Sequence, residues 1–221
     1  MNQPAAKIEL WHCADTRSFR VLWVLEELRL PYQLHLLPFP PRARMPEYLE
    51  INPLGTIPSM RDGDTFMTES AGIVQYLATR HAPNELVVGV EDRAYGSWLN
   101  WLHFGEATLT FPQTLIMRYR KLEPGRAEQV ADDYARWFMS RLRQVDRTLQ
   151  ATPWLCAGRF TAADISVGYA LLLADFLELS SRFPQAVAEY WLRLQARPAF
   201  QAAKGAQKGS LAAELASLQH A

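Results

Sequence analysis

Asn52-Pro53-Leu54-Gly55-Thr56-Ile57-Pro58, with the Glu69-Ser70 pair that follows it, carries the strongest structural signal in this chain. Because proline lacks a backbone N–H, Pro58 belongs at the start, the edge or a bend of a strand. If the Ile57-Pro58 peptide bond is cis, the free backbone of Ile57 turns outward and can pair with an extended peptide. Glu69-Ser70 begins an apolar helix, whose first N–H groups, hydroxyl and dipole suit a carboxylate. A short peptide with a free carboxylate would match both features.

The residues before this stretch predict a βαβ unit. We expect a strand over Lys7–His12, a helix that starts within Asp15–Ser18, and a second strand over Tyr32–Leu37. The helix has an apolar stripe at three- and four-residue spacing, and Pro31 ends it. A strand, a helix and a strand in this order imply that the two strands pair in parallel.

The residues after Pro58 predict a hairpin and a closing helix. Two short extended runs, Ile57–Met60 and Thr65–Met67, are separated by Asp62-Gly63-Asp64, which is a good turn sequence. A helix over Ser70–Arg80 follows. The order β-α-β and then β-β-α is that of a thioredoxin-like domain.

The remainder of the chain predicts helices only. The fold class is therefore α+β followed by all-α, with a thioredoxin-like domain over 1–82 and an all-helical domain over 90–221. Thr161 and Asp164 form a variant capping box, which we interpret as structural. The helix-like segments are Glu91–Gln113, Arg126–Gln150, Ala162–Leu177, Gln185–Ala196 and Ser210–His220, and Ala82–Gly89 is a linker.

Composition narrows the function classes. The 221 residues have zero formal net charge, so nucleic acid is not an expected partner. The longest apolar run, Ala170–Ala174, is far below the roughly 20 residues of a membrane span, and the N-terminus lacks a signal-peptide pattern. Cys13 and Cys156 form neither a disulfide framework nor a zinc spacing, so we expect no metal and a cytoplasmic protein.

Four segments in order resemble the glutathione S-transferase superfamily. They are Trp11–Trp23 with its Thr16-Arg17-Ser18-Phe19-Arg20 loop, the Ile57-Pro58 strand start, the Glu69-Ser70 helix start and Trp98–Glu106. The first and last of them resemble the bacterial and fungal branch with a Thr/Ser-Arg-Ser loop. The resemblance covers almost the whole chain, and it implies a homodimer that uses glutathione as co-substrate.

The resemblance places glutathione on the first domain. Thr56-Ile57-Pro58 would position its cysteinyl backbone, Glu69 would pair with its ammonium group, and Ser70 would bind its γ-glutamyl carboxylate. Arg42 and Arg44 could reach the glycyl carboxylate, although solvated charges are the default for such a loop.

The thiol of glutathione has to be activated before it can attack. A thiol with a pKa of about 8.5 is mostly protonated at neutral pH, and only the thiolate is nucleophilic. By its position in the family, Thr16 would donate a hydrogen bond to the sulfur, unless it merely caps the helix. Ser18 is the alternative donor, and Arg17 could hold the thiolate or a carboxylate electrostatically. Cys13 could instead form a mixed disulfide, but it lacks the proline that follows in the cysteine classes and is expected to be buried.

The predicted function is a cytoplasmic glutathione S-transferase that conjugates glutathione to small hydrophobic electrophiles in detoxification. The alternatives are glutathione-dependent disulfide or peroxide reduction, and a non-catalytic protein-interaction module of the same fold. We expect the histidines, His12 and His35 among them, to be isolated from any metal or catalytic triad. The electrophile is expected in an apolar cleft between the domains, with candidate residues Trp11, Trp101, Phe104, Phe111 and Tyr119.

Overall fold

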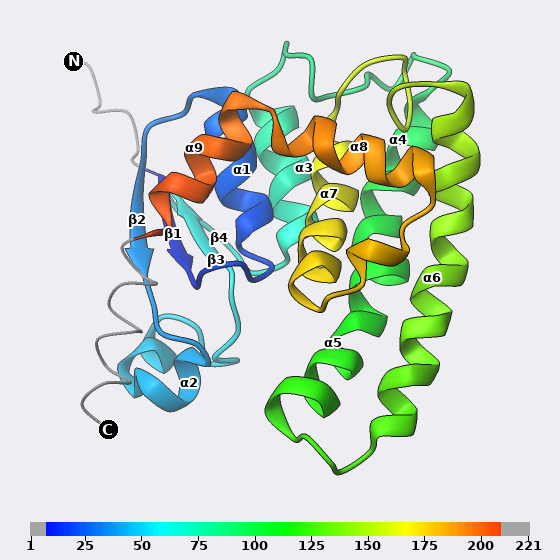
Figure 1. Ribbon diagram of the computed structural model, residues 1–221. Helices are drawn as coiled ribbons and strands as arrows, with labels where there is room; N and C mark the ends of the chain where they lie inside the picture. Colours follow the sequence, from blue (N-terminus) through cyan, green and yellow to red (C-terminus); the bar gives the residue numbers. More distant parts are fainter. Residues whose placement is uncertain (1–7, 209–221) are drawn as a thin grey trace, which may run out of the picture. The chain divides into compact units, whose positions relative to one another are not determined.

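The computed structural model describes residues 8–208, which divide into two compact units (Figure 1). The first unit contains the chain up to His81 together with the described residues from Arg197 onward. The second unit is Ala82–Ala196. No helix in this described part of the chain is long and apolar enough to cross a membrane.

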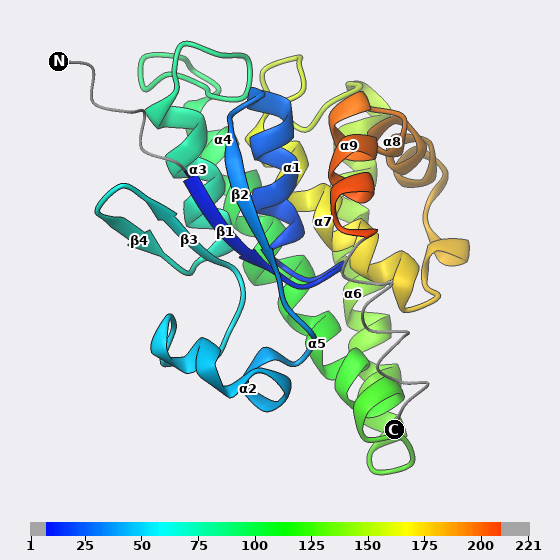
Figure 2. The same cartoon turned by 90° about the vertical axis from the view of Figure 1, so that its left-hand side faces the viewer.

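The first unit is built on a mixed sheet whose four described strands lie in the order β2-β1-β3-β4 (Figure 2). β1 pairs in parallel with β2 and antiparallel with β3, and β3 and β4 form the predicted hairpin. The predicted thioredoxin-like order is therefore confirmed. The elements are β1 (Ile8–His12), α1 (Phe19–Leu28), β2 (Tyr32–Leu36), the short helices α2 (Pro41–Arg44) and η1 (Pro46–Glu50), β3 (Ser59–Asp62), β4 (Thr65–Met67) and α3 (Ser70–Arg80).

The helix α9 (Pro198–Ala206) belongs to this first unit, whereas the sequence pattern put its residues in the all-helical domain. Phe200 explains the difference, because its ring lies 5.3 Å from that of Phe19 and 5.0 Å from that of Trp23 on α1. Arg197 adds a two-pronged ion pair to Glu27, with N···O distances of 2.6 and 2.9 Å. The helix predicted over Ser210–His220 lies outside the described residues.

The second unit is helical throughout its described secondary structure, as predicted. The helix expected to end at Gln113 continues through π-helical turns as far as Leu122. Gly105 lies so close to α7 that a Cβ there would overlap Ser166, whose hydroxyl donates to the Leu102 carbonyl across 2.6 Å. The elements are α4 (Tyr95–His103), η2 (Phe104–Thr110), α5 (Phe111–Met117), η3 (Arg118–Leu122), α6 (Glu128–Ala151), α7 (Ala162–Phe176), η4 (Ser180–Arg182) and α8 (Gln185–Gln195).

The capping box at the start of α7 is present and structural. The Thr161 hydroxyl accepts from the Ala163 N–H, and the Asp164 carboxylate accepts from the Thr161 N–H across 2.8 Å. Tyr190 donates to the same carboxylate across 2.8 Å. Burial raises the pKa of Asp164 to about 6. These bonds satisfy the polar groups of a helix that is buried on nearly all sides.

Candidate functional site

Ile57 presents a free backbone just before β3. The Ile57-Pro58 peptide bond is cis, and Ser59, paired with Trp11, is the first residue of β3 in the ladder with β1. Among the described residues, no hydrogen bond satisfies the backbone N–H or C=O of Ile57. Both groups can therefore pair with an extended peptide placed alongside, as one added strand pairs with a sheet edge.

The turn before Ile57 is fixed by its own side chains. Asn52 accepts from the Leu54 N–H across 3.1 Å and donates to the Thr56 carbonyl across 2.8 Å. The Tyr48 hydroxyl donates to the same carbonyl across 2.7 Å. Gly55 has a φ of +60°, and a Cβ there would lie 2.7 Å from the Arg42 Cβ. The glycine is thus required both by the left-handed backbone and by the close packing.

The start of α3, in the same unit, has features that suit an anion. Glu69 is the exposed N-cap residue, no side chain caps the helix, and its first turn contains no acidic residue. Ser70 is buried and accepts a 3.1 Å hydrogen bond from Nη1 of Arg20, whose side chain is fully buried. The N–H groups of the first turn, the helix dipole and the Arg20 charge all favour a carboxylate here. No role was predicted for Arg20 from the sequence, although an arginine inside the apolar run from Phe19 to Leu25 is a signal that its charge has a buried partner.

The loop between β1 and α1 carries the two candidate hydroxyls. Helix α1 begins at Phe19, just after the predicted range, and has no side-chain cap. The half-buried Thr16 donates to the Cys13 carbonyl across 2.8 Å and lies 2.9 Å from the Ser18 hydroxyl. Ser18 is fully buried, so it has no surface on which to meet a ligand. Thr16 is therefore the partly accessible hydroxyl of the pair, and its side chain does not cap α1. Arg17 is half-buried.

His12 has two hydrogen-bond partners that were not predicted from the sequence. It is fully buried at the end of β1, with Nδ1 2.7 Å from Ser18 Oγ and Nε2 3.0 Å from Gln207 Oε1. Burial lowers the pKa of His12 to about 4, so the imidazole is neutral at physiological pH. The alternation of His12 with the buried Ile8 and Leu10 could indicate that His12 is buried. It could not indicate the partner, because Gln207 is 195 residues away in the chain.

His35 also has a partner, since its Nε2 lies 2.9 Å from a carboxylate oxygen of Glu9. The ring of His35 stacks on Trp11, with centroids 4.7 Å apart. Trp11 itself is buried in a cluster with Leu37 and Tyr48. Its indole is thus part of the core of the first unit, and its expected role in electrophile binding stays a prediction.

Both cysteines are free and buried. The thiol of Cys13 is fully buried in the same cluster and lies 3.5 Å from the Pro38 carbonyl oxygen. This agrees with the small buried residue expected there, and it leaves no access for a mixed disulfide. Burial raises the pKa of the Cys156 thiol, which makes that group unreactive too.

The aromatic candidates of the second unit differ in exposure. Trp101 is buried and packs edge-on against the half-buried Phe104, with centroids 5.1 Å apart. Phe111 is exposed, and Tyr119 is half-buried with the Arg118 guanidinium 5.7 Å from its ring centroid. Arg42 and Arg44 are exposed on α2 of the first unit, and their role stays a prediction.

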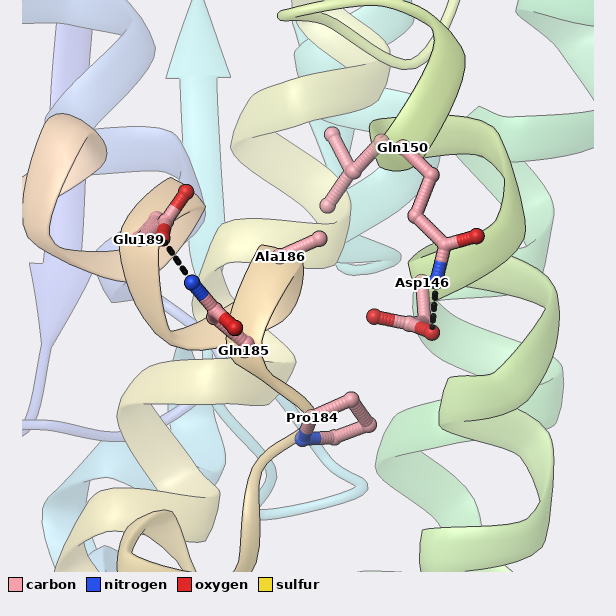
Figure 3. Close-up of a pocket in the computed structure, with 7 residues that line it drawn as sticks. Asp146, Gln150, Pro184, Gln185, Ala186 and Glu189 are labelled. Carbon is pink, nitrogen blue, oxygen red and sulfur yellow. Dashed lines mark hydrogen bonds between the residues drawn. The ribbon is translucent and has the colours of Figure 1, made fainter.

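The second unit also contains a polar cavity of about 380 Å³ (Figure 3). Its amides are hydrogen-bonded to neighbouring carboxylates, Gln150 to Asp146 across 2.8 Å and Gln185 to Glu189 across 2.9 Å. None of the predicted site residues lines it. The lining residues are Asp146, Leu149, Gln150, Pro184, Gln185, Ala186 and Glu189. Within residues 8–208, no group of three or more His, Cys, Asp or Glu side chains could hold a metal ion.

Known proteins resemble this chain over nearly its full length. A family model described as "Glutathione S-transferase, N-terminal domain" matches residues 16–80. Glutathione S-transferase 3 of Schizosaccharomyces pombe is 25% identical over 205 residues, covering 87% of this chain and 84% of the relative. A glutathione transferase structure from Methylococcus capsulatus has 26% identity and a TM-score of 0.81, covering 91% of this chain and 98% of that one. One from Phanerochaete chrysosporium in complex with oxidized glutathione has 26% identity and a TM-score of 0.81, covering 93% and 98%.

Proposed function

The chain belongs to the glutathione S-transferase superfamily, and we propose that it binds glutathione on its first unit and conjugates it to small hydrophobic electrophiles. Its relatives are named as transferases, which supports an enzyme of that class. The glutathione transferase structure from Phanerochaete chrysosporium is a complex with oxidized glutathione, which supports glutathione as the ligand.

The observation that carries the proposal is the pairing of a free strand backbone with an anion-binding helix start in one unit. The N–H and C=O of Ile57 would hydrogen-bond the cysteinyl residue of glutathione, next to Thr56 and Pro58. The start of α3 would bind the γ-glutamyl end, with Ser70 on the carboxylate and Glu69 on the ammonium group. Arg20 adds a buried positive charge behind Ser70. These groups match a peptide that has a free carboxylate next to an ammonium group.

Thr16 is the residue proposed to stabilise the thiolate, because its hydroxyl is half-buried while that of Ser18 is fully buried. The thiol proton leaves to solvent, and the sulfur then forms a bond to the electrophilic carbon as the leaving group departs with its electron pair. Lowering the thiol pKa by one unit requires about 1.4 kcal/mol. A hydrogen bond to a charged group contributes about 1.5–3 kcal/mol, so one hydroxyl donor is enough. Arg17 would add a positive charge to the same loop.

The acceptor would contact aromatic side chains of the second unit. Phe111, with 59% of its surface exposed, and the half-buried Phe104 and Tyr119 are the candidates with accessible rings. A homodimer, a cytoplasmic location and a role in detoxification belong to the same proposal. The free cysteines are compatible with a reducing compartment.

Disulfide reduction is a second candidate function, because the glutathione transferase structure from Phanerochaete chrysosporium holds a disulfide, oxidized glutathione. The same thiolate would attack a disulfide sulfur, form a mixed disulfide with glutathione and release the other half as a thiolate. The buried Cys13 would take no part in this reaction. Turnover of a disulfide panel compared with a panel of apolar electrophiles decides between the two acceptors.

Calorimetry with reduced glutathione tests the binding site. Wild type should bind, and the double variant Glu69→Ala with Ser70→Ala should lose most of the affinity. Glu128→Ala is the matched control, because Glu128 is also an exposed acid at a helix start but lies in the second unit. No binding to wild type at millimolar glutathione would refute the proposal and favour the protein-interaction module.

A further inference from the structure

A continuous chain of hydrogen bonds joins the end of α9 to the loop that carries Thr16. Gln207, just after α9, contacts His12 across 3.0 Å, His12 contacts Ser18 across 2.7 Å, and Ser18 contacts Thr16 across 2.9 Å. Three of these residues, Gln207, His12 and Ser18, are buried. Lys204 of α9 reinforces the connection through a 2.7 Å ion pair with Asp15.

The orientation of the Gln207 amide is fixed by Asp15. Gln207 Oε1 accepts from the Asp15 backbone N–H across 3.2 Å, and Gln207 Nε2 donates to the Asp15 carboxylate across 2.6 Å. A backbone N–H can only donate and a carboxylate can only accept, so the amide cannot be reversed. The amide oxygen therefore faces Nε2 of His12, and that nitrogen must carry the hydrogen.

The direction of the remaining bonds follows from this tautomer. With its hydrogen on Nε2, neutral His12 offers a lone pair at Nδ1, and the Ser18 hydroxyl has to donate to it. The single proton of Ser18 is then committed to the interior. The 2.9 Å contact between Ser18 and Thr16 is made by the Thr16 proton, which is shared with the Cys13 carbonyl.

The Thr16 proton can be redirected at little cost. The Cys13 carbonyl also accepts from the Thr16 backbone N–H across 3.4 Å, so it keeps a donor when the Thr16 hydroxyl rotates away. Ser18 keeps its bond to His12 in either arrangement. Of the two hydroxyls, Thr16 is thus the one able to donate outward.

We propose that Gln207 and His12 are positioning residues, which fix the direction of hydrogen bonding so that Thr16 rather than Ser18 serves the glutathione thiolate. The proposal rests on the proposed function, and it assigns α9 a part in thiol activation. Removing Gln207 would free His12 to move its proton to Nδ1, and Ser18 would then donate to Thr16 or to the Cys13 carbonyl, 3.3 Å from its oxygen, instead of to His12. The bond from Thr16 to Ser18 would be lost, and the thiolate preference of bound glutathione should change by about two- to tenfold, the range for one neutral hydrogen bond.

The experiment compares wild type with Gln207→Met, which keeps the length of the side chain and removes its polar atoms. Nitrogen-15 NMR of the glutathione-free protein reports which His12 nitrogen carries the hydrogen, and ultraviolet titration reports the thiol pKa of bound glutathione. We expect the Nε2–H tautomer in wild type, and in Gln207→Met a shifted thiol pKa and a changed kcat at neutral pH with little change in KM. His12→Asn keeps an acceptor at the position of Nδ1, so it should retain more activity than His12→Leu.

Arg197→Met is the matched control, because it removes the ion pair to Glu27 at the other end of α9. It should leave the thiol pKa unchanged. A hydrogen on Nδ1 in wild type would overturn the inference, as would an unchanged thiol pKa in Gln207→Met or an equal shift in Arg197→Met. Loss of glutathione binding in wild type would overturn the proposed function instead, and the NMR measurement would still test the hydrogen-bond direction.

Discussion

Nη1 of Arg20 lies 3.1 Å from Oγ of Ser70, so a fully buried guanidinium on α1 supports the first residue of α3. Arginine is always protonated, so it brings a permanent positive charge behind the helix start. A carboxylate bound at this end of α3 would face both the helix dipole and the arginine charge. We therefore expect the charge in the apolar face of α1 to support ligand binding as well as the structure.

Replacing Arg20 by Met should weaken glutathione binding by about tenfold to a hundredfold, the range for a hydrogen bond that involves a charged group. The variant removes the donor to Ser70 and the charge that favours a carboxylate. Calorimetry measures the change, and circular dichroism verifies that the variant is folded. Arg136→Met on the exposed face of α6 is the control. A folded Arg20→Met protein with wild-type affinity would show that Arg20 is only structural.

Cys13→Ala should retain most of the conjugating activity. The Cys13 thiol is fully buried and lies against the Pro38 carbonyl, so it cannot reach bound glutathione. The main effect should be a loss of stability on the order of 1 kcal/mol from the smaller side chain. Initial rates and thermal melts measure both effects, with Cys156→Ala as the control. If Cys13→Ala lost its turnover and wild type carried a glutathione adduct on Cys13, the mixed-disulfide mechanism would apply.

Gly55→Ala should destabilise the turn before Ile57 by about 1–3 kcal/mol, because the new Cβ meets both an unfavourable backbone and a crowded site. Its Cβ would lie 2.7 Å from the Arg42 Cβ. Gly125→Ala separates the two causes, since Gly125 also has a positive φ but nothing within 4 Å of a Cβ. Urea denaturation of both variants should give the larger loss for Gly55. Equal losses would mean that the packing around Gly55 yields easily.

His12 should make the stability of the first unit depend on pH. Burial lowers its pKa from 6.5 to about 4, so between these values the unfolded chain binds a proton that the folded protein does not. Stability from this group is complete above pH 6.5 and is lost as the pH falls toward 4. The free energy of unfolding of wild type, minus that of His12→Asn, should therefore rise by up to about 3 kcal/mol as the pH increases from 4 to 6.5.

Urea denaturation at a series of pH values gives this difference. His103→Asn is the control, since it makes the same substitution at an exposed histidine of the second unit. A His12→Asn profile that ran parallel to that of wild type would mean that His12 does not titrate differently on folding.

The features predicted correctly from sequence are those that neighbouring residues determine. The Asp62-Gly63-Asp64 turn, the strand before it and the α3 helix beginning at Ser70 all follow from turn chemistry and from apolar spacing. The thioredoxin-like order follows from these elements because few topologies connect them. The proposed ligand residues Ile57 and Ser70 lie beside two local signals, Pro58 and the start of the apolar helix α3.

The features that were missed depend on contacts between distant residues. No periodicity could indicate that Phe200 packs against Phe19, or that Gln207 hydrogen-bonds to His12, which lies 195 residues earlier in the chain. The burial of Trp11 was missed for a similar reason. Trp11 packs in a cluster with Tyr48, which comes from a proline-rich segment whose conformation is set by tertiary packing.

Ultraviolet titration of bound glutathione tests the central claim most directly, because thiolate absorbance reports binding and activation together. In wild type, the thiol pKa of bound glutathione should lie clearly below its solution value of about 8.5. Thr16→Val should raise this pKa by about one unit or more, as expected for a lost hydrogen bond to a charged sulfur. Thr16→Ser keeps the hydroxyl and should stay close to wild type. A wild-type thiol pKa equal to the solution value, or the same pKa in Thr16→Val as in wild type, would contradict this account.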